Sequence, residues 1–353
     1  MKAERAGEIL ARYPEVAVAI VGDFFLDKYL AIEKALTEVS LETGLDAYQV
    51  VAKRLSPGAA GTVTNNLTAL EVGRVLAVGF TGDDGEGYEL RQGLARTGVD
   101  MTHLLRRPDL FTPTYTKPML RDEAGAEAEL NRIDIKNREA TPADLEDAVL
   151  DELRAALGDA HACAVQAVIV GDQVAERGLG TITDRVREGI CAMAAAHPDV
   201  VFFADSRESI ALFRDVIIKP NKFEAAKACG YTGAEDDLSA SDAERYGAEL
   251  VTRNRRPVFV TAGAEGIVVF DEAGRTLVPG VPVPPPIDIV GAGDSTTAAI
   301  VASLCAGASL KEAAAIANCV ASITIQQLGT TGTATRAQVA KRSAENAGLF
   351  EGV

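Results

Sequence analysis

The sequence predicts an α/β fold in which helices cover both faces of a mainly parallel sheet. Short apolar runs rich in Val and Ile recur along the chain between turn residues. Such runs are typical of strands that are buried on both faces. Segments rich in Ala, Leu, Glu and Arg alternate with them, and their apolar residues recur at helical spacing. This alternation indicates a doubly wound sheet.

The expected strands are residues 16–21, 75–78, 164–170, 200–204, 216–218 and 258–261. The expected helices are residues 86–97, 142–157, 179–196, 241–253, 298–307 and 310–326. Two stretches break the alternation, because residues 28–55 and 104–134 are rich in Thr, Tyr and Val with scattered charges. We expect these two stretches to form the strands of a small lid, inserted in a single domain that spans residues 1–353.

The composition excludes several classes of protein. Of 353 residues, 47% are hydrophobic and 24% charged, as in globular proteins with an ample core. A formal net charge of −16 repels nucleic acid and anionic lipid, so we expect neither as a partner. No apolar stretch approaches a membrane span, and the N-terminus has no apolar signal core. We therefore expect a cytoplasmic protein.

The cysteines agree with a reducing compartment. They lie far apart in mostly apolar surroundings and show no paired spacing of metal ligands, so we expect reduced core thiols. The five are Cys163, Cys191, Cys229, Cys305 and Cys319.

Residues 288–294, Asp-Ile-Val-Gly-Ala-Gly-Asp, form the most informative motif. Gly291 and Gly293 allow successive N–H groups to point inward, and the helix that follows adds its positive end, so the segment suits a phosphate. Asp294 is placed to take a proton from a hydroxyl that attacks the terminal phosphorus of a nucleotide. A strand-to-helix turn with Asp294 as an N-terminal cap explains the same seven residues equally well.

Three further segments carry polar groups. Asp23 and Asp27 follow a strand that ends at Gly22, where ligands bind in open α/β sheets, although a polar turn has the same composition. Residues 57–66 hold small residues that permit close approach of a ligand, or tight helix packing. Asn221 and Glu224 share one face of a helix start and can organise Mg²⁺ and water, or form an ordinary capping box.

Taken together in this order, these segments resemble the ribokinase-like PfkB carbohydrate kinases. Residues 78–87 and 260–266 add to the resemblance, which covers almost the whole chain. The resemblance implies a doubly wound sheet with a β-strand lid. It also implies that ATP binds near the carboxyl edge of the sheet and that its γ-phosphate passes to a sugar hydroxyl.

The resemblance also implies a role for individual residues. Asp294 is the general base, and the anion hole comprises Gly291, Ala292 and Gly293. Asn221 and Glu224 shape the Mg²⁺ and phosphate environment, and Asp288 is a candidate ligand for K⁺. The residues implied to lie along the nucleotide are Thr261, Gly263, Gly266 and Asn318, together with Asn221 and Glu224. Those implied to face the sugar are Asp23, Asp27, Gly58, Ala59 and Asn66. Asn66 could equally have a structural role within a helix.

Within the family, the chain is most similar to the heptose-7-phosphate kinases of lipopolysaccharide precursor synthesis. The cues include residues 26–29, 38–43, 114–117 and 131–134. Lys117, Arg121 and Arg132 are lid cations in an acidic chain, and such groups suit phosphate oxygens. The alternative is that they pair with nearby Asp and Glu residues on the surface of the lid.

The chain also departs from the family pattern. Ala59 replaces the usual second Gly of the sugar loop, and Thr62 stands where Asn is expected. The usual Asp-Pro-Lys of heptose kinases is Asp-Ser-Arg at residues 205–207. These changes leave the identity of the sugar open.

We therefore expect an ATP-dependent sugar kinase that acts on a sugar or sugar phosphate with Mg²⁺. A kinase for a nucleoside or another small alcohol is the alternative on the same fold, and a sensor that binds a sugar or nucleotide without turnover is the alternative from another class. A lid with an exposed strand edge also favours a homodimer formed through the lid.

Overall fold

The computed structural model describes residues 1–122, 125–158, 164–238 and 240–353, so that Cys163 lies outside the described residues. A nine-stranded sheet forms the centre, in the order β16-β15-β14-β13-β12-β11-β1-β6-β7. Its strands are β1 (Ala17–Gly22), β6 (Arg74–Gly82), β7 (Leu104–Arg107), β11 (Ala167–Asp172), β12 (Val201–Ser206), β13 (Ile217–Ile218), β14 (Val258–Thr261), β15 (Gly266–Asp271) and β16 (Gly274–Pro279). Neighbours pair in parallel except for β14 with β15 and β15 with β16, which confirms the mainly parallel sheet.

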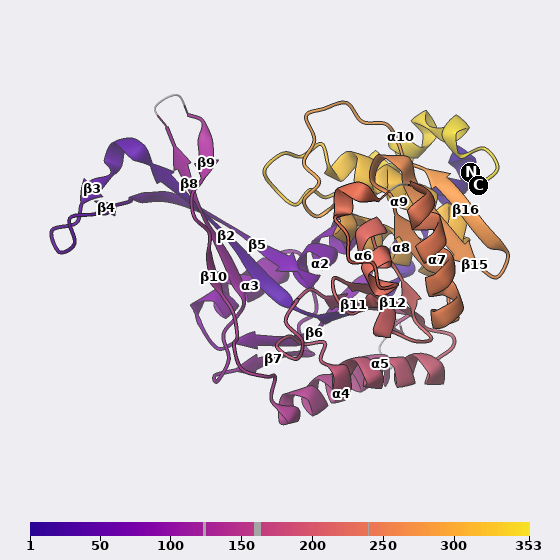
Figure 1. Ribbon diagram of the computed structural model, residues 1–353, viewed down its shortest axis with the longest axis horizontal. Coiled ribbons are helices and arrows are strands. Elements are labelled where there is room, and N and C mark those ends of the chain that lie inside the picture. Colours follow the sequence, from indigo (N-terminus) through magenta and orange to yellow (C-terminus); the bar gives the residue numbers. More distant parts are fainter. Residues whose placement is uncertain (123–124, 159–163, 239) are drawn as a thin grey trace.

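Helices cover both faces of this sheet, and Figure 1 shows α4 and α5 on the side opposite α8 and α9. The helices are α1 (Ala3–Ala11), α2 (Ala60–Ala69), α3 (Gly85–Arg96), α4 (Ala143–Gly158), α5 (Asp184–Ala196), α6 (Lys222–Ala228), α7 (Ala240–Asn254), α8 (Ala292–Cys305), α9 (Leu310–Thr324) and α10 (Arg336–Glu345).

Each face of the sheet has its own hydrophobic core. Side chains of a strand point alternately to the two faces. Val18 and Ile20 of β1 therefore join the core under α1, α2, α8, α9 and α10. Ala19 and Val21 join the second core, under α4, α5, α6 and α7. This two-sided burial explains why the expected strands read as nearly continuous apolar runs.

The lid is a second sheet that projects from one edge of the body (Figure 1). It has the strand order β10-β8-β2-β5, with β9 paired to β8, and a two-stranded ribbon of β3 and β4 extends it. The strands are β2 (Phe24–Glu33), β3 (Glu38–Val39), β4 (Asp46–Ala47), β5 (Val50–Ala59), β8 (Thr114–Arg121), β9 (Glu127–Glu129) and β10 (Ile133–Ile135).

The expected lid segments need one correction. Residues 104–107, which we expected in the lid, form β7 and pair with β6 at the edge of the central sheet. The buried Leu104 side chain packs into the core there. The lid strands also reach further into the body than expected, because β2 begins at Phe24 and β5 ends at Ala59.

Gly22 brings two strand ends together at the base of the lid. A Cβ atom at Gly22 would collide with the backbone carbonyl of Gly171, so only Gly allows β1 and β11 to approach this closely. The chain then passes directly from β1 into β2 through Asp23. The carboxyl edge of the central sheet therefore lies against the lid.

Two other expectations concern thiols and membrane spans. Cys191, Cys229, Cys305 and Cys319 are free thiols, and Cys319 is buried. Across the described ranges, no helix is both long enough and apolar enough to cross a bilayer.

Candidate active site

The start of α8, at Gly291, Ala292 and Gly293, has the geometry of an anion cradle. Gly291 caps the helix in the left-handed region, with φ of +79°, and a Cβ there would lie 3.2 Å from the Thr331 side chain. In the described part of the chain, no protein acceptor pairs with the N–H groups of Gly293 and Asp294. These amides and the positive end of α8 suit an anion.

A buried cation lies beside this cradle. Lys219, directly after β13, is 3% exposed, and its Nζ donates to Asp205 Oδ2 at 2.9 Å. Thr297 of α8 donates its hydroxyl to the same oxygen at 2.9 Å. A Cβ at Gly293 would lie 3.7 Å from Lys219 Nζ, so the ammonium group is next to the cradle.

Asp294 has the electrostatic properties of a general base. Its side chain is half-buried in the first turn of α8. Burial and the Asp205 carboxylate raise the pKa of Asp294 to about 7, against the opposing effects of Lys219 and Arg207. A base with a pKa near the working pH transfers protons effectively. Asp27 also raises this pKa, which places the two carboxyl groups near each other.

Asn221 and Glu224 form the capping box at the start of α6. Asn221 Oδ1 accepts from the Glu224 N–H, and Glu224 Oε2 accepts from the Asn221 N–H, both at 2.8 Å. Burial and Asp205 raise the pKa of Glu224 to about 7, while Lys219 lowers it. Among the described residues, Glu224 Oε1 accepts no protein hydrogen bond. That oxygen is available for a water molecule of a hydrated Mg²⁺.

Asp288 joins two loops beside the cradle. Its Oδ1 accepts from the Val290 N–H and its Oδ2 from the Gly329 N–H, each at 3.0 Å. Its own N–H donates to Ile325 at 2.8 Å. Within the ranges that the structure describes, no three His, Cys, Asp or Glu side chains cluster to hold a metal ion. A metal here would depend on phosphate oxygens, backbone carbonyls and water.

The residues expected along the nucleotide separate into two groups. The N–H of Thr261 donates to Pro220 at 3.0 Å, which joins the end of β14 to the start of α6. Gly263 has φ of +59° and open space around the position of a Cβ, so a ligand can approach its backbone.

Gly266 and Asn318 have packing contacts. A Cβ at Gly266 would collide with the Val278 carbonyl. The Asn318 amide donates to Val278 and Pro279, at 3.0 and 2.9 Å, and fixes α9 to β16. Both residues are used in packing the hairpin of β15 and β16, and their contact with the nucleotide stays a prediction.

Asp23 and Asn66 are withdrawn from the expected sugar contacts. Asp23 is 4% exposed, and its carboxylate accepts three backbone N–H groups, from Gln173, Val174 and Thr181, at 2.7 to 3.1 Å. Asn66 is wholly buried and donates to Thr62 within its own helix at 3.0 Å. Asp23 fixes the loop after β11, and Asn66 is the structural helix residue of the alternative interpretation.

Asp27 remains as a candidate carboxylate within the lid. It lies in β2 with 13% of its side chain exposed, and the Lys117 Nζ approaches it at 3.5 Å. Burial raises the pKa of Asp27, whereas Lys117 and Arg132 lower it. A Cβ at Gly58 would collide with the Asp27 carboxylate, so Gly58 makes room for it.

Ala59 follows Gly58 with φ of +54°, a region that favours Gly. This conformation costs about 1–3 kcal/mol in a residue that has a Cβ. The strain explains physically why Gly is the usual residue at this position.

The three lid cations are not equivalent. Arg132 pairs with Asp134 through two hydrogen bonds of 2.7 and 2.8 Å, and Arg121 pairs with Glu127 at 2.7 Å. These two therefore have the local acidic partners of the alternative interpretation. Lys117 instead contacts Asp27 and the Tyr29 hydroxyl, the latter at 3.1 Å.

Sequence reasoning missed Lys219 and Asp205 as site residues. Asp205 begins the Asp-Ser-Arg segment at residues 205–207, and Lys219 directly precedes Pro220 and Asn221. Neither segment by itself indicates that the two side chains contact each other. The available signal was a Lys placed between a strand and Pro220 in a strongly acidic chain. A cation at a strand end in such a chain indicates a local anion partner.

Comparison with known proteins identifies the family. Residues 38–337 match the model of the pfkB family carbohydrate kinases. The chain belongs to this family. It is therefore a phosphotransferase that acts on an alcohol group of a carbohydrate, on the fold that the sequence predicted.

Among curated relatives, the pfkB kinase described here is 29% identical over 333 residues to the "Bifunctional protein HldE" of Azorhizobium caulinodans. The match covers 94% of this chain but only 65% of that relative, so the chain spans less than two thirds of its length.

Among solved structures, phosphofructokinase-2 from Escherichia coli in complex with potassium superposes with a TM-score of 0.70 at 17% identity, covering 94% of this chain and 99% of that one. Ribokinase from Arabidopsis thaliana, complexed with ribose and ATP, gives a TM-score of 0.64 at 18% identity, covering 93% and 98%. These two likenesses concern the fold.

The raised pKa of Asp294 predicts a pH-dependent effect of Asp294→Asn on stability. The folded pKa, about 7, lies above the value of about 3.9 in an unfolded chain, so wild type loses stability as the pH rises between the two. Asn resembles the protonated form and escapes this loss. We expect the free energy of unfolding of the variant to exceed that of wild type at about pH 8, and the difference to shrink toward about pH 5.

Urea denaturation over this pH range measures the effect. Asp199→Asn is the control, because Asp199 is an exposed aspartate between α5 and β12. A stability difference for Asp294→Asn that stays constant with pH would contradict the raised pKa.

Proposed function

We propose that this protein is an ATP-dependent sugar kinase in which Asp294 is the general base. The observation that carries the proposal is the juxtaposition at the start of α8. A carboxyl with a pKa of about 7 stands beside the buried ammonium group of Lys219 and beside amides that have no acceptor among the described residues. A cytoplasmic location, where ATP is abundant, fits this activity.

The proposed reaction assigns one task to each group. The sugar hydroxyl oxygen bonds to the γ-phosphorus, the bond from that phosphorus to the bridging oxygen of ADP breaks, and Asp294 receives the hydroxyl proton. The amides of Gly293 and Asp294 and the ammonium group of Lys219 stabilise the charge on the transferred phosphoryl group. Mg²⁺, when bound with the nucleotide, neutralises further phosphate charge; Glu224 and Asn221 are the residues that would orient its water ligands. Asp288 would help to bind K⁺ beside the cradle.

Asp27 positions the acceptor in this proposal. Its carboxylate can accept hydrogen bonds from sugar hydroxyls, and its electrostatic effect on Asp294 is consistent with the two carboxyl groups being near each other. Gly58 lies against the Asp27 carboxylate, and Ala59 follows it at the end of β5. Holding the hydroxyl between Asp27 and Asp294 would contribute through orientation.

The general-base role predicts that Asp294→Asn abolishes phosphoryl transfer. An amide cannot accept the hydroxyl proton, so we expect the rate of ADP release to fall by a factor of about 100 or more. Binding of ATP, measured by calorimetry, stays near the wild-type affinity. Asp199→Asn keeps full activity, and an Asp294→Asn variant that is as active as wild type would sink the assignment.

We further propose that the acceptor is a phosphorylated sugar of the heptose phosphate class. Support comes from Lys117, whose ammonium group stands beside Asp27, and from the resemblance to the HldE protein. A phosphate held by Lys117 would place a sugar hydroxyl along Asp27.

Replacing Lys117 tests this choice of acceptor. We expect Lys117→Ala to raise the KM for a heptose 7-phosphate by about tenfold or more, and to change the KM for unphosphorylated sugars much less. Arg121→Ala is the matched control, because Arg121 pairs with Glu127 away from Asp27. Equal losses for both kinds of sugar would show that Lys117 serves only as the ion partner of Asp27.

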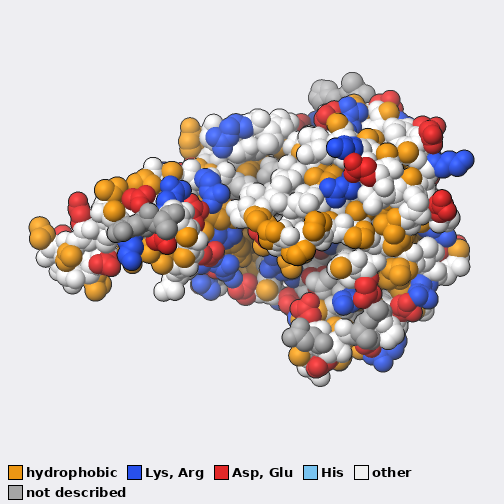
Figure 2. Space-filling model, turned by 90° about the horizontal axis from the view of Figure 1, so that it is seen from above, with side chains coloured by type: hydrophobic (Ala, Val, Ile, Leu, Met, Phe, Trp, Pro, Cys, Tyr) orange, Lys and Arg blue, Asp and Glu red, His pale blue; other side chains and the backbone are white. Residues whose placement is uncertain are grey.

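We also propose that the lid forms the interface of a homodimer. Large hydrophobic side chains are exposed on the β3–β4 ribbon and beside it, and Figure 2 shows hydrophobic surface at the end of the projecting lid. They are Leu36, Val39, Leu41, Leu45, Tyr48, Val50 and Val51. An apolar surface of this kind marks an interaction site.

The lid interface predicts a change of mass for a double variant, Leu41→Glu with Leu45→Glu. Light scattering of wild type should give twice the mass of one chain, and the variant should give the mass of one. Leu212→Glu is the control, because Leu212 is an exposed leucine on the body. A monomeric wild type would remove the proposal.

A further inference from the structure

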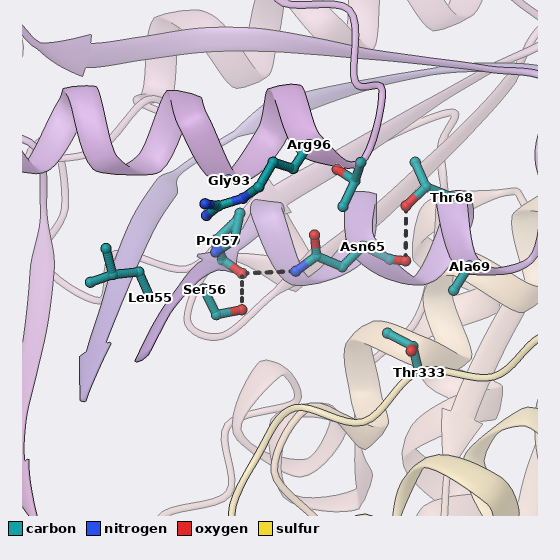
Figure 3. A pocket seen from close by; sticks show the side chains of 10 residues that line it. Leu55, Ser56, Pro57, Asn65, Thr68, Ala69, Gly93, Arg96 and Thr333 are labelled. Atoms are coloured by element: carbon teal, nitrogen blue, oxygen red, sulfur yellow. Dashed lines mark hydrogen bonds between the residues drawn. The ribbon is translucent and has the colours of Figure 1, made fainter. Parts of the chain in front are cut away.

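A second groove lies outside the Asp27–Asp294 site. It has a volume of about 490 Å³ and is formed by the end of β5, one face of α2 and the end of α3, with Thr333 on its border. Figure 3 shows that the Arg96 side chain comes from α3 and the Asn65 side chain from α2, and both line this groove. The volume suits a small metabolite.

Two polar groups of the groove lack partners. The Arg96 side chain is exposed, and in the described chain its guanidinium group makes no hydrogen bond or ion pair. Asn65 donates its amide to Pro57 at 3.3 Å, while its buried Oδ1 has no donor among the residues described. An unpaired buried carbonyl oxygen is costly, and this oxygen reaches a donor on a ligand only when the Asn65 side chain turns toward the groove.

These groups define the chemistry of the ligand. The guanidinium fork binds a phosphate with paired hydrogen bonds, which is notable in a chain with a net charge of −16. The border adds the hydroxyl groups of Ser56, Thr68 and Thr333, which pair with sugar hydroxyls. A phosphorylated sugar matches both features.

The groove shares its walls with the active site. Pro57 lines the groove, and the next residue, Gly58, makes room for the Asp27 carboxylate. On the other border, Thr333 is two residues from Thr331, which packs against Gly291 of the anion cradle. A ligand that moves the Pro57 wall therefore acts on the Asp27 end of the catalytic site, and one that moves the Thr333 wall acts on the Gly291 end.

We propose that this groove is a second binding site, for a phosphorylated sugar, and that its occupancy changes the affinity of the Asp27–Asp294 site. The proposed effect on the Asp27–Asp294 site, which is the regulatory half, rests on the proposed kinase function. The proposed binding of a phosphorylated sugar, which is the binding half, does not. Such coupling is a free energy between two distinct sites and acts in both directions.

Calorimetry without nucleotide tests the binding half, with fructose 6-phosphate, ribose 5-phosphate, inorganic phosphate and unphosphorylated ribose as probes. We expect Arg96→Ala to weaken binding of a sugar phosphate to the groove by about tenfold or more, and Arg96→Lys to weaken it less. Arg256→Ala, at an exposed arginine before β14, is the control. Because Arg96 has no protein partner among the described residues, its replacement leaves the fold intact.

The Lys117→Ala variant separates the two proposals. If sugar phosphates bind at both sites, Lys117→Ala removes one binding event and Arg96→Ala the other. If the active site does not take sugar phosphates, binding in wild type is single and depends on Arg96 alone. Unchanged binding in Arg96→Ala would overturn the second site, and equal affinity for inorganic phosphate and the sugar phosphates would overturn the assigned ligand class.

The rate of ADP release tests the regulatory half. We expect the rate of ADP release by wild type to depart from a hyperbolic dependence on sugar phosphate concentration. The rate for Arg96→Ala should follow a hyperbola and equal the wild-type rate at low sugar phosphate concentration. Identical curves for the two proteins would overturn the coupling.

Discussion

The ion pair of Lys219 and Asp205 is the interaction on which the candidate site depends. A buried ammonium group is costly unless it is paired and hydrogen-bonded, and Asp205 meets this need at 2.9 Å. Asp205 in turn accepts from Thr297, so β12, β13 and α8 are fixed to one another at the point where a phosphate would bind. Removing one partner would leave an unpaired charge in the interior.

The same pair controls the electrostatics of its neighbours. Asp205 raises the pKa of Glu224 and Asp294 in addition to the effect of burial, while Lys219 lowers both. Together these opposing charges leave both carboxyl groups with pKa values of about 7. A base that titrates near neutral pH, beside a cation that attracts phosphate, is the combination that phosphoryl transfer requires.

The absence of a side chain is a second constraint on the site. Gly22 permits the close approach of β1 and β11, Gly58 makes room for the Asp27 carboxylate, and Gly291 turns the chain into α8 beneath Thr331. Ala59 shows the cost of departing from this rule, because its Cβ occupies a backbone region that favours Gly. The strained backbone of Ala59 lowers the stability of the folded chain, while Gly58 still leaves room for the Asp27 carboxylate.

The sequence by itself determined the fold class and the order of the motifs, because strand and helix periodicities are local properties of the chain. It also predicted Asp294 and the glycines at the start of α8 as site residues. Tertiary structure alone decided how the polar residues are used, since Asp23 and Asp27 look alike in sequence, but Asp23 accepts backbone N–H groups whereas Asp27 accepts none among the described residues. In the same way, Asn66 turned inward, residues 104–107 joined the central sheet, and Lys219 met Asp205. These outcomes follow from contacts between segments far apart in the chain, which no local pattern encodes.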